Sequence, residues 1–508
     1  MGKMTFLDLK RLNVRIFAVL KVANIVLAFI LVFSYKINIR GVESNVIYTI
    51  QSTLLDHNNL YTNPEQIPYA ISQYMPFYYI VCDNIIRLLG LSPGQDVHLI
   101  YVVCRGLSFF LAILLAFCLG RMMYDIFKCS PFASWLVAAF SIFVNTPWFY
   151  LARPDVFVSL FSFAALYFFL RHMKEDPPRL TLLLLSGFLC FFSFFSKQNG
   201  LITFLILASY LFFRLRFRDL SMLIGGFLLA SFIGYLLYMP YSSSFLLKNV
   251  FWGVFDNGIS IENALTGTYQ SALTRFGMIA FADILAIYFL VKTTGLKSLD
   301  EKTQLLVYYF AVLLVFSCMT SLKIGSAINH FSDTLILSLV ILVIAFKRFA
   351  GYYDLNKQVT LLNLLVFLVL SFGLTVSIQN YYSFGRKNLR TILTHDNPYA
   401  HKVVRFLNRQ INRHDNFYFF SADRSLNNRF PANCIFPQQY IVRLCTFPRR
   451  TFDYSDFEKK VDDGTIKLYI TKKQIIDFAG VELTKKFTFY KKIGEYKIYL
   501  NNGYKGEL

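Results

Sequence analysis

Acidic and basic side chains stand beside long apolar segments of this chain, where they could act together on a charged ligand. Glu43 follows the first apolar run, Asp155 closes the stretch Ala152-Arg-Pro-Asp155, and Lys197 lies in Ser196-Lys-Gln-Asn-Gly200. A carboxylate can accept a proton from a hydroxyl group. Cations can hold a phosphate and stabilise the charge that develops as it leaves. These residue types therefore suit the transfer of a sugar from a lipid-linked phosphate to a hydroxyl.

The composition places these residues in a membrane protein. The chain has 508 residues, of which 56% are hydrophobic and 16% are charged, whereas a soluble domain carries about 25% charged residues. Apolar residues gather in runs such as 180–195 and 361–374. Because a bilayer core about 30 Å thick needs about 20 such residues per helix, we expect several spans. Disordered, collagen-like and small disulfide-bonded classes are excluded.

The basic residues predict an orientation. Formal net charge is +21, and the basic clusters lie in every second loop between apolar segments, near residues 3–15, 121–128, 171–179, 214–218, 292–302 and 347–357. Lys and Arg concentrate in cytoplasmic loops, so the N-terminus is expected in the cytoplasm. We attribute the excess charge to topology and anionic lipid rather than to nucleic acid.

The expected fold class is an α-helical polytopic membrane protein with a small C-terminal α/β domain. About eleven spans are predicted, near residues 16–34, 105–124, 131–149, 156–171, 180–196, 200–214, 220–239, 276–292, 303–320, 331–346 and 359–378. The apolar segment 75–91 is short and contains Asp83 and Arg87, so we expect a helix at the outer interface. Eleven spans put the C-terminus outside. The expected domains are a transmembrane catalytic domain over 1–379, including an outer loop at 35–104, and an extracytoplasmic domain over 380–508.

The tail differs in composition from the rest of the chain. Charged residues become frequent after residue 380, and alternating stretches near 467–471 and 496–500 indicate strands, while 397–412 has helical spacing. The basic surface of this domain either rests on anionic lipid or is simply solvated. Cys434 and Cys445 both fall in it, where they form a disulfide in an oxidising compartment or stay free thiols.

Several short motifs, in order over residues 15–335, carry a resemblance to a known family. They are Gly41-Val-Glu43 with the run to Asn59-Leu-Tyr61, Gln73-Tyr-Met-Pro76-Phe-Tyr-Tyr79, Arg105-Gly-Leu-Ser108, Ala152-Arg-Pro-Asp155, Ser196-Lys-Gln-Asn-Gly200 and Lys323-Ile-Gly-Ser-Ala-Ile-Asn-His330. The set resembles the GT-C superfamily of membrane glycosyltransferases. The most similar branch is the family 39-like group of protein-mannosyltransferase and aminoarabinose-transferase type.

The resemblance implies an inverting, single-displacement glycosyl transfer at the outer face, from a polyprenyl-phosphate sugar to an acceptor hydroxyl. Glu43 is the expected general base, and Asp155 is expected to contact the acceptor or the sugar. The residues expected to hold the donor phosphate are Lys197, Arg105, Arg153 and Arg275. The residues expected to line the substrate cavity are Tyr61, Tyr74, Tyr78, Tyr79, Asn329 and His330.

Each assignment has a structural alternative. Glu43 could instead stabilise the N-terminus of a helix through its negative charge. Asp155 could form a salt bridge with Arg153 or another cation. The tyrosines could pack at the membrane interface, and His330, which stands where the family pattern has tyrosine, could be a buried structural histidine. Asp155 stands alone rather than in an Asp-x-Asp pair, so we assign no metal ligands and no definite cofactor, and a divalent metal stays an open alternative.

Two other functions stay open on sequence grounds. A transporter or flippase of a lipid-linked sugar would use ionisable groups at mid-membrane, where only Asp283 fits. A non-enzymatic assembly protein would not need the outer acids and cations. The expected partners are a polyprenyl-phosphate sugar, membrane lipid, and an acceptor glycan, glycolipid or protein. The expected location is the plasma (inner) membrane of a bacterium.

Overall fold

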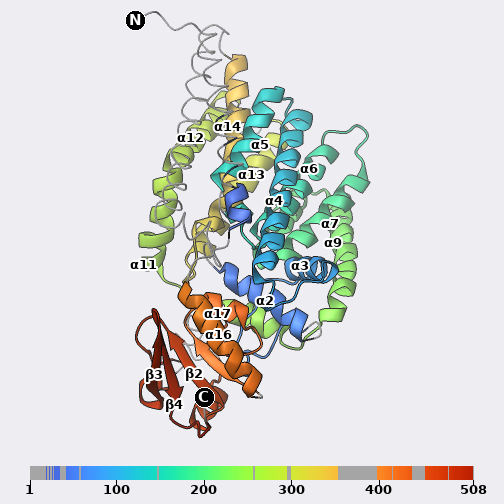
Figure 1. Ribbon diagram of the computed structural model, residues 1–508. Helices are drawn as coiled ribbons and strands as arrows, with labels where there is room; N and C mark the ends of the chain where they lie inside the picture. The colour runs from blue at the N-terminus through green and yellow to red at the C-terminus, as the bar shows by residue number, and fades with distance from the viewer. Residues whose placement is uncertain are drawn as a thin grey trace, which may run out of the picture. The chain divides into compact units, whose positions relative to one another are not determined.

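The computed structural model describes residues 42–56, 59–145, 148–255, 258–294, 299–352, 398–414, 416–437, 452–478 and 480–506, with scattered positions between 19 and 34. Contacts divide the chain into two compact units. The first, which we call the helical unit, contains Met1–Phe33, Gly106–Tyr235 and Ile259–Leu389. The second, the mixed unit, contains Ser34–Arg105, Leu236–Gly258 and Arg390–Leu508. Figure 1 labels the elements of both.

The described part of the helical unit consists of helices and helical turns. Its longer helices are α4 (Val97–Arg121, which begins in the mixed unit), α5 (Pro131–Val144), α6 (Asp155–His172), α7 (Leu180–Ser196), α8 (Leu201–Phe213), α9 (Phe217–Tyr238), α12 (Gln270–Thr294), α13 (Glu301–Ser321) and α14 (Ser332–Tyr352). Short elements join them, namely η1 (Met122–Ile126), η2 (Trp148–Tyr150), η3 (Gln198–Gly200), α11 (Ile261–Asn263), η6 (Ala264–Tyr269) and η8 (Ile328–Phe331).

The lengths and composition of these helices are those of a multi-pass membrane protein. Among the described residues, five helical segments are long and apolar enough to cross a bilayer, and a bent pair, Ile261–Thr274 with Ile279–Lys292, would make six. Leu180–Ser196 and Gln198–Phe213 are apolar but shorter. The predicted span at 359–378 lies outside the described residues, as does most of 16–34. The number of eleven spans therefore stays a prediction.

Small residues allow α7 and α9 to pack closely. A side-chain carbon at Gly187 of α7 would overlap the backbone of Leu223, and one at Gly226 of α9 would overlap the backbone of Leu184. Helices in membranes associate through such small residues because hydrocarbon surroundings give them no hydrophobic drive to pack. This contact fixes α7, whose C-terminal end leads into the Lys197 segment.

The mixed unit combines short helices with one sheet. Its helical elements are α2 (Glu43–Leu55), α3 (Phe77–Leu88), η4 (Met239–Tyr241), η5 (Lys248–Trp252), α10 (Gly253–Phe255), α16 (Pro398–Arg413), α17 (Arg424–Arg429), α19 (Ser455–Asp462) and α20 (Leu483–Lys486). Helix α3 has 12 residues, a length of about 18 Å at 1.5 Å per residue, which is too short to cross a bilayer. Its predicted position at the outer interface stays a prediction.

The sheet has four strands, β1 (Tyr418–Ser421), β2 (Ile466–Thr471), β3 (Phe487–Ile493) and β4 (Tyr496–Asn501), in the order β1-β2-β4-β3. Strand β1 is parallel to β2, while β4 is antiparallel to both β2 and β3. Gly494, at φ +59°, makes the tight turn between β3 and β4. The predicted strands at 467–471 and 496–500 are β2 and β4, so the small C-terminal α/β fold is confirmed (Figure 1).

Segments far apart in the sequence form the core of the mixed unit. Tyr69, from the predicted outer loop, stacks on Phe436 with ring centroids 4.8 Å apart, and its backbone N–H donates to the carbonyl of Ile435 at 2.9 Å. The Asn428 side chain of α17 donates to Gln51 Oε1 of α2 at 2.9 Å, and Gln51 Nε2 donates to the backbone carbonyl of Asn428 at 2.7 Å. The outer loop and the tail therefore share one core, which the sequence did not indicate.

Two sequence predictions about the tail are untested by these contacts. The boundary near residue 379 falls among residues 353–397, which the structure does not describe. Cys434 is a buried thiol that donates to the amide oxygen of Asn427 at 3.2 Å. Because Cys445 lies outside the described residues, the disulfide question stays open.

Candidate active site

A buried ion pair joins two of the predicted site residues in the mixed unit. Glu43 is the first residue of α2, and Arg105 lies on α4. The Arg105 Nε and Nη2 groups donate to Glu43 Oε1 at 2.7 Å and Oε2 at 2.8 Å, so the contact is bidentate. Both side chains have an exposed fraction of 0%. The pair holds the Glu43 carboxylate in one orientation.

Further contacts hold the guanidinium of Arg105. Its Nη1 donates to the carbonyl of Ser34 at 2.9 Å, and its Cζ lies 4.7 Å from the centre of the Tyr101 ring. A buried cation needs such partners because its charge has lost contact with water. Arg105 was predicted to hold a donor phosphate, and in this structure it is already engaged by Glu43.

A second cluster, in the helical unit, surrounds the carboxylate of Asp155. Lys197 Nζ donates to Asp155 Oδ1 at 2.9 Å, and Asn329 Nδ2 donates to the same oxygen at 2.8 Å. Arg153 Nε lies 3.0 Å from Asp155 Oδ2, and the Arg153 guanidinium stacks over Trp148 at 4.7 Å. We call Asp155, Arg153, Lys197 and Asn329 the Asp155 cluster. It brings together three predicted phosphate-site or catalytic residues and one predicted cavity residue.

Local sequence explains how two members of the cluster are positioned. Pro154 precedes α6 and Asp155 is its first residue, where a negative charge is favourable beside the free N–H groups of the helix start. Helix α7 ends at Ser196, and Lys197 is extended, with φ −162° and ψ 143°. Gly200 completes the following turn at a place where a side-chain carbon would overlap the backbone of Ser193. The break between α7 and α8 therefore directs Lys197 toward α6.

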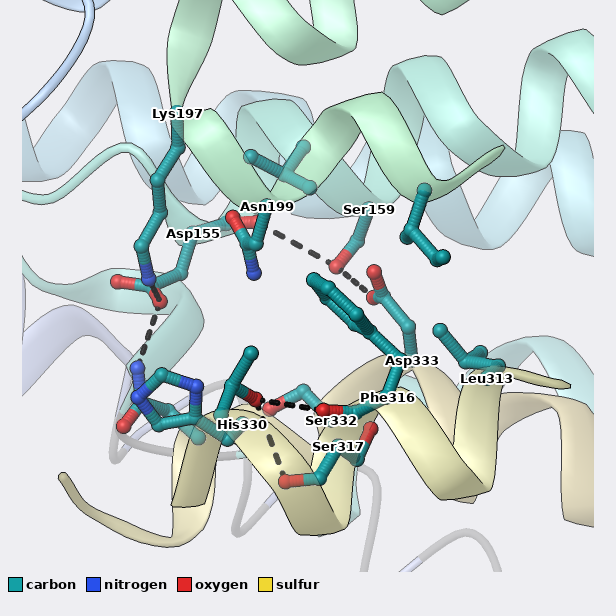
Figure 2. A pocket seen from close by; sticks show the side chains of 14 residues that line it. Asp155, Ser159, Lys197, Asn199, Leu313, Phe316, Ser317, His330, Ser332 and Asp333 are labelled. Carbon is teal, nitrogen blue, oxygen red and sulfur yellow. Dashed lines mark hydrogen bonds and ion pairs between the residues drawn. The ribbon is translucent and has the colours of Figure 1, made fainter. Parts of the chain in front are cut away.

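A small polar cavity lies beside the Asp155 cluster (Figure 2). It measures about 20 Å³, which is enough for about one water molecule. Lys197, Asn199, His330 and Asp333 contribute to its lining. Within the part of the chain that the structure describes, the Oδ1 atom of Asn199 and the Nδ1 atom of His330 have no hydrogen-bond partner. The cavity therefore offers unused polar atoms to a ligand.

Sequence reasoning missed the second carboxylate of this cavity. Asp333, in the first turn of α14, accepts a hydrogen bond from the Ser159 hydroxyl. Ser159 lies one helical turn after Asp155 and also bonds to the Asp155 carbonyl at 3.3 Å. Two signals pointed to these residues: the i to i+4 spacing from Asp155 to Ser159, and the position of Asp333 just after Asn329 and His330.

The other predicted residues have varied surroundings. The side chain of Arg275 lies outside what the structure describes. The four tyrosines of the predicted cavity are buried in the mixed unit. Tyr61 donates to the carbonyl of Tyr74 at 2.9 Å, and Tyr78 donates to the carbonyl of Cys104 at 3.4 Å. These contacts fit the structural alternative, in which the tyrosines pack within the protein at the membrane interface. A role of the tyrosines in substrate binding stays a prediction.

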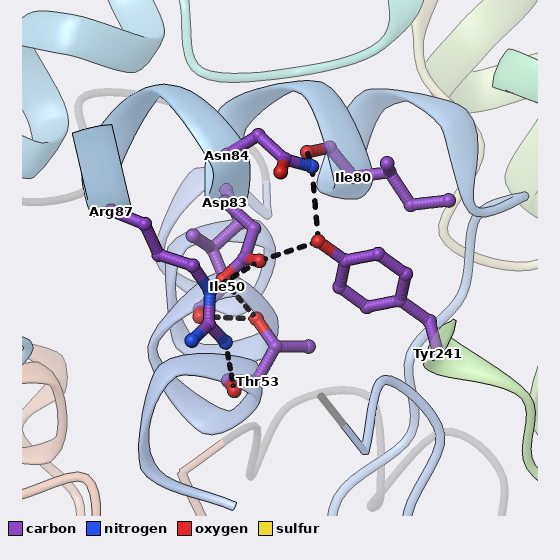
Figure 3. A network of polar contacts seen from close by, with 7 residues as sticks. All are labelled: Ile50, Thr53, Ile80, Asp83, Asn84, Arg87 and Tyr241. Carbon is purple, nitrogen blue, oxygen red and sulfur yellow. Dashed lines mark hydrogen bonds and ion pairs between the residues drawn. The ribbon is translucent and has the colours of Figure 1, made fainter. Parts of the chain in front are cut away.

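The acidic and basic residues of α3 form a separate network in the mixed unit (Figure 3). Asp83 accepts from Arg87 Nε at 2.8 Å, from the Tyr241 hydroxyl at 2.7 Å and from Thr53 Oγ1 at 3.0 Å. Arg87 Nη2 also donates to the Thr53 carbonyl at 2.7 Å. These bonds tie α2, α3 and η4 together, so we assign Asp83 a structural rather than a chemical role.

The ionisable residues of the site therefore form two groups, one in each unit. Glu43 and Asp155 are each paired with at least one cation, whereas Asp333 accepts a hydrogen bond from Ser159. Among the described residues, no group of three or more His, Cys, Asp or Glu side chains could hold a metal ion.

Comparison with known proteins finds structures of similar fold but no match by sequence. No protein-family model matches the chain, and no curated protein matches it. The solved structure of ArnT from Cupriavidus metallidurans bound to undecaprenyl phosphate has a TM-score of 0.59 and 12% identity, over 96% of this chain and 98% of that one. The archaeal oligosaccharyltransferase AglB from Archaeoglobus fulgidus, in complex with an inhibitory peptide and a dolichol-phosphate, has a TM-score of 0.53 and 12% identity. That match covers 98% of this chain and 75% of the other.

At this level of identity the likeness concerns the fold, and it extends over nearly the whole of this chain, including the tail. The chain therefore has the fold of these two structures, as the resemblance of its motifs implied.

Proposed function

We propose that this protein is a glycosyltransferase that moves a sugar from a polyprenyl-phosphate donor to an acceptor hydroxyl. The observation that carries the proposal is the Asp155 cluster, in which two cations and an amide hold one carboxylate beside a polar cavity, in a GT-C fold. ArnT and AglB, whose structures share this fold, are described with undecaprenyl phosphate and dolichol-phosphate respectively. A lipid-phosphate donor is therefore the substrate class we favour.

In the proposed reaction, the oxygen of the acceptor hydroxyl attacks the anomeric carbon of the sugar. Glu43 accepts the proton that this hydroxyl loses. The bond from that carbon to the phosphate oxygen breaks, the configuration inverts, and polyprenyl phosphate leaves with the electron pair. Arg105 would keep the Glu43 carboxylate oriented toward the acceptor. A carboxylate oxygen has a second lone pair, so the bond from Arg105 leaves room for the acceptor proton.

Lys197 and Arg153 are the proposed phosphate-binding cations. Within the Asp155 cluster they carry two positive charges against the single negative charge of Asp155, while the carboxylate of Asp333, which lines the same cavity, opposes that excess. Asp155 would hold the two cations in place before the donor arrives, which reduces the reorganisation needed during the reaction. Asn199 and His330 offer polar atoms to the sugar or to the phosphate.

The proposed orientation places the N-terminus in the cytoplasm, and the loop at 35–104 and the C-terminal domain outside the plasma membrane. Single cysteines at exposed positions test it in intact cells with a membrane-impermeant thiol reagent. Gln95→Cys and Lys505→Cys should react from outside, whereas Asp176→Cys should react only after the cells are opened. The unsubstituted protein measures background from the native thiols. Labelling of Asp176→Cys in intact cells together with no labelling of Gln95→Cys would reverse the orientation.

The transfer itself is tested with purified protein, a panel of labelled polyprenyl-phosphate sugars and an envelope extract as the source of acceptor. Mass spectrometry follows the release of polyprenyl phosphate. Glu43→Gln is expected to lower turnover by at least about 100-fold, the range of general base catalysis. Glu262→Gln is the matched control, because this glutamate is exposed on α11 and should leave turnover unchanged.

Two outcomes would contradict the proposal. Full turnover in Glu43→Gln would remove Glu43 as the base. Movement of intact lipid-linked sugar across proteoliposomes without cleavage of the sugar–phosphate bond would favour the transporter instead.

A further inference from the structure

An apolar groove runs along the helical unit, among α12, α13 and α14. Its volume is about 500 Å³, within the range of pockets that bind drug-sized ligands. Phe276 and Ile279 of α12, Phe310 of α13 and Leu335 of α14 are among the residues that line it. Leu273, at one edge, is 68% exposed. In a chain that crosses a membrane, such a groove is open to hydrocarbon chains.

One carboxylate interrupts this apolar lining. Asp283 lies near the middle of α12, lines the groove, and has an exposed fraction of 1%. Neither of its carboxylate oxygens has a hydrogen-bond partner among the described residues. The Ser338 hydroxyl on α14 interacts with the carboxyl but makes no hydrogen bond of normal geometry with it. The groove thus has a single strongly polar site within an apolar wall.

A carboxyl group in this position is costly for the fold. Ionisable side chains inside membrane helices are rare, and they usually pair with one another or face a ligand path. The Asp155 cluster follows this rule through its protein partners, whereas Asp283 has no comparable set of partners among the described residues. A ligand group that bonds to Asp283 would supply what the protein lacks.

We propose that the groove binds the hydrocarbon chain of a membrane lipid that carries a hydroxyl group along the chain, and that Asp283 hydrogen-bonds to this hydroxyl. A hydroxyl fits because it is neutral, so its burial adds no charge to an apolar groove, and it can both donate and accept. A cationic group would need additional polar neighbours, and among the described residues the remaining lining offers only the hydroxyls of Tyr269, Thr334 and Ser338 and the thiol of Cys318. Thr334 is already bonded to the Ser317 hydroxyl at 2.8 Å.

The inference does not depend on the proposed glycosyl transfer. It concerns the affinity of a groove for one class of lipid, and it can be measured on a protein with no added donor or acceptor. Its failure would therefore leave the proposed transfer unaffected, and failure of the transfer would leave the inference standing.

The test uses the full-length protein in detergent and native mass spectrometry to count bound lipid. The probes are phosphatidylcholines whose octadecanoyl chain carries one hydroxyl near its middle, one hydroxyl near the headgroup, or none, and undecaprenyl phosphate as a chain without hydroxyls. One of the hydroxylated lipids should bind about tenfold more tightly than the unsubstituted lipid, the effect of one hydrogen bond in an apolar site.

Three variants assign that preference to the groove. Asp283→Leu should bind the hydroxylated and unsubstituted lipids equally, while Asp283→Asn, which can still hydrogen-bond, should keep part of the preference. Gly277→Leu should weaken binding of both lipids, because this glycine lines the groove and a Cβ atom placed there would meet no atom of another packed, described segment within 4 Å. Gly225→Leu is the matched control, since this glycine on α9 is equally open but lies outside the groove.

Several results would overturn the inference. They are equal binding of all the phosphatidylcholines by the unsubstituted protein, a preference that survives Asp283→Leu, and binding that Gly277→Leu does not weaken. Tighter binding of undecaprenyl phosphate than of any hydroxylated lipid, blocked by Gly277→Leu, would assign the groove to an isoprenoid chain and would also overturn it.

Discussion

Asp155 and Asp283 are both buried carboxylates of the helical unit, but their surroundings differ. Asp155 lies at the start of α6, where Lys197, Arg153 and Asn329 contact its two oxygens. Asp283 lies in the middle of α12, and its oxygens have no hydrogen-bond partner among the described residues. The first carboxylate is one part of an assembled cluster, and the second faces an apolar groove.

The difference indicates two ways in which a membrane protein keeps a buried charge. Where the partners are protein groups, removing the carboxylate leaves buried cations without compensation, and the fold is weakened. Where the partner is a ligand, removing the carboxylate relieves the empty protein of an unpaired polar group. The fold is then stabilised while ligand binding is lost, as is common at functional sites.

The largest expected effect comes from replacing each aspartate by leucine. Asp155→Leu should lower the melting temperature by about 10 °C, because breaking a buried ion pair costs about 3–5 kcal/mol. Asp283→Leu should raise it by about 2–4 °C. Thermal unfolding of both variants in the same detergent, followed by tryptophan fluorescence, measures the contrast. Equal destabilisation by the two substitutions would remove the distinction between the sites.

The second prediction concerns the cation that bonds to Asp155. Lys197→Met should lower kcat/KM for the lipid-phosphate donor by about 100-fold or more, because it removes a charge that would face the developing phosphate. Lys197→Arg keeps the charge but not the shape of the ammonium, so we expect a partial loss of about tenfold. The steady-state release of polyprenyl phosphate measures both variants. If the Lys197→Met and Lys197→Arg variants were equally active, the charge of Lys197 would have no part in donor binding.

A smaller effect is expected from the second carboxylate of the cavity. Asp333→Asn removes a negative charge near Lys197 and should lower KM for the donor by about 2–5-fold, as an anionic ligand would then meet less repulsion. Ser159→Ala is the control, because it removes the hydrogen bond to Asp333 without changing the charge. A rise in KM for Asp333→Asn would show that this carboxylate helps donor binding instead of opposing it.

The smallest effect concerns Asp423, a carboxylate of the tail that has a full set of partners. Burial opposes its ionisation, but hydrogen bonds from Ser425 and the charge of Lys472 outweigh burial and hold the pKa of Asp423 below the ordinary value. The Ser425 N–H and hydroxyl donate to Oδ1 at 2.8 Å and 2.6 Å, and the Tyr496 hydroxyl donates to Oδ2 at 2.8 Å.

Because the pKa is lowered by folding, the ionised Asp423 stabilises the protein above the unfolded-state pKa of about 3.9. That contribution is lost as the pH falls through the lower folded-state pKa. Asp423→Asn keeps a side-chain oxygen at the start of α17 but removes the charge, so it should cost about 1 kcal/mol at neutral pH and progressively less in acid. Denaturant titrations of both proteins across this pH range measure the difference, and a constant cost at all pH values would contradict the prediction.

Much of the fold was predictable because it depends on local composition. The low share of charged residues indicated a membrane protein, and the interrupted segment 75–91 indicated a short helix, which is α3. Alternating residues indicated β2 and β4. The shared core of the outer loop and the tail was not predictable, since Tyr69 and Phe436 are distant in sequence and no local pattern records their contact.

The candidate site was predictable only as a set of residue types. The sequence alone determined that carboxylates and cations stand at the ends of apolar helices, because a bilayer excludes them from most other positions. The tertiary structure decided which groups pair: Glu43 with Arg105, and Asp155 with Lys197 and Asn329. It also decided that Asp333 lines the cavity and that, within the described ranges, Asp283 has no comparable partners. The physical reason is that pairing depends on how helices pack and rotate against one another, and this depends on contacts between residues far apart in the chain.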